Sequence, residues 1–107
     1  LAKLKMNDLE HEITSSKLQI RNKISAIKQE LDSYVRQNDI TRVMVEDYET
    51  LVKAEERKFT MGESSLFLVN TRESKLIDAK LKAIELENQY FSTKALLFNS
   101  LIANTSL

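Results

Sequence analysis

Proline is absent from this sequence, and Gly62 is its only glycine. Globular domains normally use both residues repeatedly, because they are the strongest local signals for turns. Their scarcity excludes a fold of many short elements, and a β-sheet in particular. Leucine, lysine, glutamate, isoleucine, alanine and serine fill most positions, and most of these favour or tolerate helix. The composition therefore predicts one domain that contains two or three very long helices.

Cysteine and long apolar runs are absent as well. The lack of cysteine excludes disulfides and thiolate chemistry, and it gives no indication of the redox compartment. No apolar run approaches the ~20 residues that cross a bilayer, and no secretory leader is visible. The chain begins with Leu1 rather than methionine, which favours a piece of a longer protein. We expect contact with a membrane only through parts outside this piece.

An excess of charge of either sign is also missing, because 16 basic residues balance 16 acidic ones. Nucleic-acid-binding proteins usually carry a basic excess on one face, and segments that bind membrane surfaces carry polybasic clusters. Both classes are therefore disfavoured, and we expect no nucleic-acid partner. The charges alternate in sign along most of the chain, which is typical of a solvated helical surface with weak ion pairs.

No constellation for catalysis or metal binding is present. His11 is the only histidine and lies in the polar stretch 8–12. A metal ligand or general base needs converging partners, so a solvated surface histidine is the simpler interpretation. The adjacent carboxylates Glu55 and Glu56 point about 100° apart on a helix and do not share a site. With no phosphate loop or nucleophile motif either, we expect no enzyme, no cofactor and no metal.

A regular ladder of apolar residues fills the first part of the chain. Its steps are mostly alternating threes and fours, which is typical of a helix that buries one seam. No helix breaker interrupts it, so we expect one helix over about residues 2–60. The ladder comprises Leu9, Ile13, Ile20, Ile24, Ile27, Leu31, Tyr34, Val45, Tyr48, Val52 and Phe59.

The ladder breaks at Gly62, which is placed to end the helix in the left-handed conformation of a C-terminal cap. Ser64 or Ser65 can then cap the next helix by accepting hydrogen bonds from its first N–H groups. We expect a tip turn over about residues 61–65 and a second helix over about residues 65–104. Because the connection is so short, the two helices form an antiparallel hairpin, an all-α coiled coil over residues 1–107.

A second apolar ladder follows the turn, and part of it repeats strictly every seven residues, at Ile77, Ile84, Phe91 and Phe98. We expect this ladder to form the second helix's side of the core, with its aromatic residues packed inside. Its members are Leu66, Val69, Ile77, Leu81, Ile84, Phe91, Ala95, Phe98 and Ile102. Folding about Gly62 places Val45 near Lys80 and Leu81, and leaves residues 1 to about 20 without a partner within the chain.

Each helix carries a second apolar group on the opposite side of its wheel at ~100° per residue. A simple hairpin needs one apolar stripe per helix, whereas two stripes give each helix neighbours on two sides, as in the wall of a helical barrel. The second groups comprise Leu4, Leu18, Ile40, Val43, Leu51 and Ala54 in the first helix, and Leu68, Ala79, Leu86, Tyr90 and Leu97 in the second.

The stretch around the turn resembles the tip of the second helical hairpin of TolC-like outer-membrane efflux proteins. In that family an aromatic residue lies three positions before a glycine, a short polar turn ends in serine or threonine, and an apolar cluster opens the returning helix. Here these places are Phe59, Gly62, Ser65 and residues 66–69. The resemblance extends along both helices and covers essentially the whole chain.

The resemblance implies a homotrimeric channel for efflux or type I secretion, which crosses the outer membrane as a β-barrel and the periplasm as an α-barrel. This chain would be one hairpin of the periplasmic α-barrel. Its tip would dock on a periplasmic adaptor (membrane fusion) protein, which links the tube to an inner-membrane pump. The docking residues implied for the tip are Gly62, Glu63, Ser64, Ser65, Leu66 and Phe67.

The family's best-described gate uses aspartates on the inner helix and a tyrosine before the turn. The matching positions here hold Leu68, Thr71 and Phe59, none of which is negatively charged. Phe59 also lacks the hydroxyl that would bond to a neighbouring helix. We therefore expect a hydrophobic or differently placed gate.

Two other interpretations remain open. The hairpin of a periplasmic adaptor protein is one, although such hairpins lie between two parts of a β-rich domain and no strand-rich flank is present. A coiled-coil spacer or dimerising scaffold is the other, and it predicts one seam per helix. At the tip, the consecutive residues Leu66, Phe67 and Leu68 form either a docking surface or a contact with neighbouring hairpins.

Overall fold

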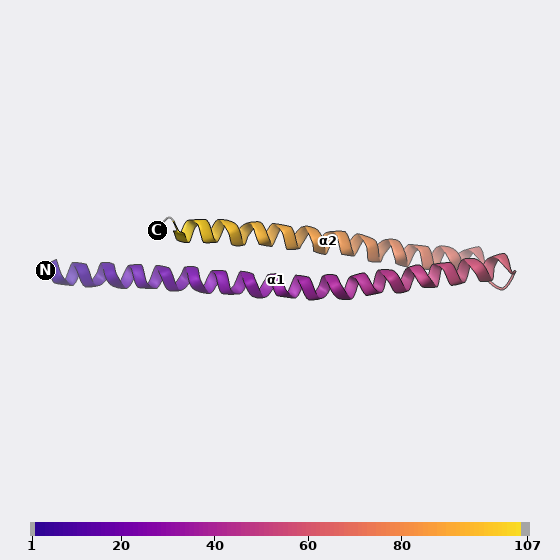
Figure 1. Ribbon diagram of the computed structural model, residues 1–107, viewed down its shortest axis with the longest axis horizontal. Coiled ribbons are helices and arrows are strands. Elements are labelled where there is room, and N and C mark those ends of the chain that lie inside the picture. Colours follow the sequence, from indigo (N-terminus) through magenta and orange to yellow (C-terminus); the bar gives the residue numbers. More distant parts are fainter. Residues whose placement is uncertain (1, 106–107) are drawn as a thin grey trace. The chain divides into compact units, whose positions relative to one another are not determined.

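Two long helices make up the structure, a computed structural model that describes the backbone of residues 2–105 and the side chains of residues 2–103 (Figure 1). Helix α1 spans Ala2–Thr60 and helix α2 spans Leu66–Thr105. No strand occurs within the described residues, which confirms the predicted all-α class. The ends of the predicted domain, Leu1 and residues 106–107, lie outside the described part of the chain.

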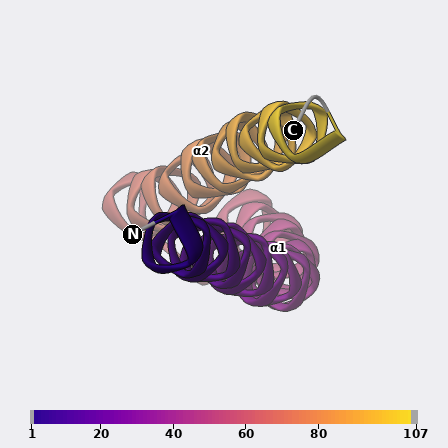
Figure 2. The same cartoon turned by 90° about the vertical axis from the view of Figure 1, so that its left-hand side faces the viewer.

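The chain divides into two units, of which the first is Ser33–Tyr90. It is an antiparallel helical hairpin, and Figures 1 and 2 show its two helices side by side from two directions. The residues of α1 that turn toward α2 recur at alternating steps of three and four, as the predicted ladder required. They are Tyr34, Asn38, Thr41, Val45, Tyr48, Val52 and Glu55, all buried or half-buried.

The face of α2 that packs in this unit is not the predicted one. Its buried and half-buried ladder comprises Val69, Arg72, Leu76, Ala79, Ala83, Leu86 and Tyr90. Leu86 is the most deeply buried of them, at 1% exposure. From the predicted main ladder only Val69 lies in the seam, whereas Leu66, Ile77, Leu81 and Ile84 are exposed.

The size of the side chains explains this error. Two ladders at heptad spacing share α2, and the prediction placed the one with larger apolar residues inside. The seam instead takes Ala79 and Ala83, whose small side chains let a helix approach its partner closely, and Ala83 lines the same groove as Val45 of α1. Hydrophobicity alone therefore selected the wrong face of this helix.

The second unit combines residues 2–32 of α1 with residues 91–105 of α2. Its inward residues are Ile20, Ile24, Ile27 and Leu31 on α1, and Thr93, Leu97 and Ser100 on α2. Ser100 satisfies its hydroxyl within the helix by donating to the Leu96 carbonyl over 2.9 Å. The predicted core positions Phe91 and Phe98 are wrong, because these side chains are 56% and 59% exposed. Residues 2–19 are all exposed, in agreement with the expected unpartnered stretch.

Candidate docking tip and outer apolar face

Helix α1 ends in a two-bond cap around Gly62. The Gly62 N–H donates to the Phe59 carbonyl over 3.0 Å, and the Glu63 N–H donates to the Lys58 carbonyl over 2.8 Å. This pair of bonds is the Schellman arrangement, which satisfies carbonyls that the last turn leaves free. Gly62 itself has φ of 76°, in the left-handed region that glycine adopts without steric cost. The sequence predicted this end of the helix from its single glycine.

Helix α2, which begins at Leu66, is capped by Ser65, one of the two serines predicted as its cap. The Ser65 hydroxyl accepts a hydrogen bond from the Leu68 N–H over 3.2 Å, and the Ser65 carbonyl accepts one from Val69 over 3.1 Å. These bonds are the normal N-cap interactions that fix where a helix starts. Ser64 does something different, because its hydroxyl donates to Oε1 of Glu55 over 3.1 Å.

The tip presents apolar side chains to the solvent. Phe67 is 77% exposed and Leu66 is 59% exposed, and Met61 on the other side of the turn is exposed as well. The turn residues Gly62, Glu63 and Ser65 are also exposed, while Ser64, which bonds to Glu55, is half-buried. Of the predicted docking residues, all but Ser64 are thus accessible on this hairpin. Clustered exposed apolar residues are typical of interaction surfaces.

The three predicted gate residues lie just behind this tip. Phe59 and Leu68 are exposed at 44% and 43%. Thr71 is half-buried, and its hydroxyl donates to the Phe67 carbonyl over 2.8 Å, which leaves it bound to its own helix. No carboxylate occupies any of these positions, so their chemistry is apolar and neutral.

A set of exposed apolar residues of α2 recurs at regular sequence spacing, and we refer to it as the outer face. Its positions follow steps of four and three, with one step of seven from Ile84 to Phe91 because the polar Asn88 takes the position between them. The outer face comprises Ile77, Leu81, Ile84, Phe91, Ala95, Phe98 and Ile102, all of them exposed. Helix α2 therefore has two regular apolar faces.

Helix α1 carries a less regular outer group. The predicted second set, Leu4, Leu18, Ile40, Val43, Leu51 and Ala54, is exposed throughout. Met44 and Val35 are exposed large apolar residues of the same helix. Single exposed apolar residues are common on protein surfaces. Exposed apolar residues that recur along both helices are more typical of an interaction surface than of scattered surface residues.

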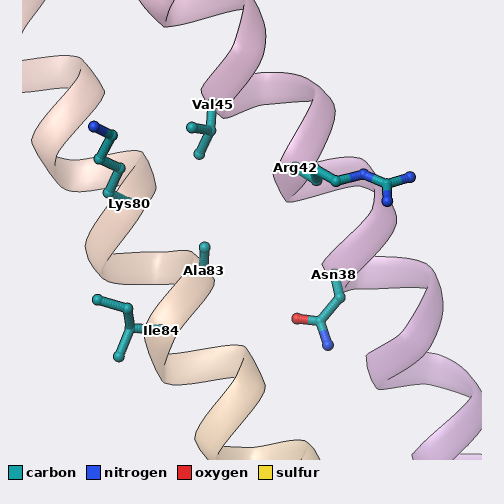
Figure 3. Close-up of a pocket in the computed structure, with 6 residues that line it drawn as sticks. All are labelled: Asn38, Arg42, Val45, Lys80, Ala83 and Ile84. Carbon is teal, nitrogen blue, oxygen red and sulfur yellow. The ribbon is translucent and has the colours of Figure 1, made fainter.

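A shallow groove opens between the helices in the Ser33–Tyr90 unit. Val45, Ala83 and Ile84 form its apolar walls, and Asn38, Arg42 and Lys80 complete its lining (Figure 3). Its volume is about 330 Å³, and the small Ala83 side chain faces into the space between the two helices. Since Val45 and Lys80 line the same groove, the register predicted for the hairpin is confirmed here. Arg42 and Lys80 are each within 3.7 Å of a carboxylate, on Asp39 and Glu49.

His11 is exposed, as the sequence indicated. No group of three or more histidine, aspartate and glutamate residues converges as metal ligands within the described part of the chain. Likewise, no described helix is long and apolar enough to cross a membrane.

Glu55 is a buried residue near the tip whose burial and contact with Ser64 were not predicted from the sequence. It was treated as one of two surface carboxylates, but it is only 6% exposed. A signal was present, because Glu55 continues the three-four spacing of Tyr48 and Val52. The position of Glu55 in the ladder predicts that it lies in the seam, whereas its residue type does not.

Comparisons with protein-family models, with curated proteins and with solved structures find no match to this chain.

Proposed function

We propose that this chain is a periplasmic helical hairpin of a TolC-like outer-membrane channel, with a structural rather than a catalytic role. The observation that carries the proposal is the pair of apolar faces on α2, with Leu86 buried in the seam and Leu81 exposed on the outer face. A hairpin that stands alone needs only the seam. A helix in the wall of a tube contacts neighbours on both sides, and both of its faces are then apolar.

The tip supports the second half of the proposal, which is docking on a periplasmic adaptor protein. A rigid turn, closed by caps at Gly62 and Ser65, holds Leu66 and Phe67 in solvent. Apolar residues on a rigid turn lose little conformational freedom on binding, which favours them as a contact surface. In this proposal three copies form the tube, the adaptor binds the tips, and an inner-membrane pump is reached through the adaptor. The protein's location is the outer membrane, with this hairpin in the periplasm.

The proposed gate is apolar, formed by Phe59, Leu68 and Thr71 from the copies of the hairpin. A constriction lined by apolar residues blocks the passage of ions because it excludes water, and it needs no charged residue to do so. Leu68→Asp in the intact channel is expected to raise the closed-state conductance to cations, because a carboxylate hydrates the constriction. If Leu68→Asp changes neither the closed-state conductance nor the ion block, Leu68 is not part of the gate.

A coiled-coil spacer is the competing function, and the regular seam of the hairpin fits it equally well. In-cell photocrosslinking of the full-length parent protein separates the two. A photoreactive residue at Leu66 is expected to capture a periplasmic adaptor protein, identified by mass spectrometry. The matched control is the same residue at the exposed position Lys28 of α1, from which no adaptor is expected. Capture of only the protein's own chain from Leu66 would leave a self-assembling scaffold.

A further inference from the structure

Glu55 places a carboxylate in the apolar seam near the tip. It lies three residues after buried Val52, on the face that packs against α2, and it is 6% exposed. Burial of a carboxylate is unfavourable unless hydrogen bonds compensate for its lost hydration. Buried charged groups are often less stabilising than an apolar side chain of similar volume. Stability alone therefore does not explain a glutamate at this position.

The partner of Glu55 indicates another role. The Ser64 hydroxyl donates to its Oε1 over 3.1 Å, and Ser64 lies between the last residue of one cap and the first of the next. On one side, the Glu63 N–H closes the end of α1, and on the other, Ser65 caps α2. The contact thus joins the body of α1 to the one residue between the two caps.

We propose that Glu55 is a positioning residue that fixes the tip through Ser64. Polar groups at seam positions of coiled coils specify register at a cost in stability, and the Glu55–Ser64 bond does this for the turn. It ties the residue between the two caps to α1 and so affects how Leu66 and Phe67 are presented to a binding partner. The role in presentation rests on the proposed docking function, whereas the role in ordering the turn does not.

Stability and tip order then respond in opposite directions to one substitution. Glu55→Leu places an apolar side chain in the seam and is expected to raise the melting temperature. The same change removes the acceptor for Ser64 and is expected to loosen the turn. Glu55→Gln keeps an acceptor oxygen and is expected to keep the turn ordered. A residue that acted only in packing would change both quantities in the same direction.

Hydrogen exchange of the 107-residue chain, followed by mass spectrometry on peptides that cover the turn, measures tip order directly. In Glu55→Leu and in Ser64→Ala, exchange at the amides of Gly62, Glu63 and Leu68 is expected to be about tenfold faster, as for loss of one buried hydrogen bond. Glu55→Gln is expected to exchange like the original chain. Glu56→Leu, at the neighbouring exposed position, is the matched control and is expected to change nothing at the turn.

Two results would overturn the proposal. One is a turn that exchanges at its original rate in both Glu55→Leu and Ser64→Ala. The other is Glu55→Gln exchanging as fast as Glu55→Leu. Ser64→Ala keeps the whole seam, so it remains informative if Glu55→Leu folds differently.

The contribution to docking is tested in the full-length parent, with the photoreactive residue at Leu66. Adaptor capture is expected to fall several-fold in Glu55→Leu and to persist in Glu55→Gln. Equal capture in both would overturn the role in presentation. If the unsubstituted parent captures no adaptor, the proposed function fails, and the exchange experiment still decides the role of Glu55 in the turn.

Discussion

The ammonium of Lys80 on α2 lies 3.7 Å from Oε1 of Glu49 on α1, so an ion pair joins the two helices in the middle of the Ser33–Tyr90 unit. Its side chains are 53% and 44% exposed. Ion pairs in such solvent contact typically contribute about 0.2–1 kcal/mol, because water and salt screen them. The ion pair therefore shows which residues of the two helices lie side by side, and it contributes little to the stability of the hairpin.

Lys80→Ala is therefore expected to lower the free energy of unfolding by less than about 1 kcal/mol, and less still at high salt. Urea unfolding at low and high ionic strength measures this. Lys82→Ala is the control, since Lys82 pairs with Glu85 of the same helix over 3.7 Å. A much larger loss in Lys80→Ala alone would mean that association of copies buries the Lys80–Glu49 pair.

Truncation of a leucine to alanine is expected to destabilise the hairpin much more on the seam face of α2 than on its outer face. Leu86→Ala removes the side chain that is 1% exposed, and it should destabilise the hairpin by about 2–5 kcal/mol. Leu81→Ala makes the same chemical change on the outer face, at 59% exposure, and should cost about 0.5 kcal/mol or less. Urea unfolding at low protein concentration compares them. A larger loss of stability in Leu81→Ala than in Leu86→Ala would show that the ladder predicted from the sequence, and not the one that contains Leu86, forms the seam.

Much of the fold was predictable from local signals. The helix ends followed from Gly62 and the serines, because capping depends on residues close in sequence. The seam of α1 followed from its three-four spacing between Ile20 and Val52. Which of two equally regular faces of α2 packs inward was not predictable from hydrophobicity, because close approach of helices rewards small residues such as Ala79 and Ala83.

The tip was predictable in part. Three consecutive apolar residues after a turn cannot all face one helix, so exposure of some of them was predicted. Leu66 was nevertheless also placed in the core ladder, and that prediction was wrong. The Glu55–Ser64 contact depends on how the turn folds back on α1, which no residue type indicates alone. Only the position of Glu55 in the ladder pointed to its burial.

Gly62 is expected to resist replacement for a reason confined to its backbone. A Cβ at this position meets no atom within 4 Å, so space does not limit substitution. The φ of 76° limits substitution instead, because a residue with a Cβ is less stable in the left-handed region by roughly 1–2 kcal/mol. Gly62→Ala is expected to destabilise the chain by about that amount, measured by urea unfolding. Gly62→Asn should cost less, since asparagine tolerates this conformation better. Equal losses in the two variants would point to an effect other than backbone strain.

The outer face of α2 is expected to make the isolated chain self-associate. Large apolar residues such as Ile77 and Ile84 are 56% and 55% exposed, at a spacing that a second helix can cover. Sedimentation equilibrium over a range of concentrations should give an average mass above that of one chain. Replacing both residues, as Ile77→Lys and Ile84→Lys, should bring the mass back toward one chain, because burying two lysines is unfavourable.

The matched control for this experiment adds the same charge at exposed polar positions of α2, as Ser92→Lys and Asn99→Lys. It separates loss of the apolar contact from general charge repulsion, since only the isoleucine variant removes apolar area. Equal dissociation in both variants would assign the effect to charge. A single-chain mass for the unsubstituted protein at the highest concentration would show that the outer face alone does not hold copies together.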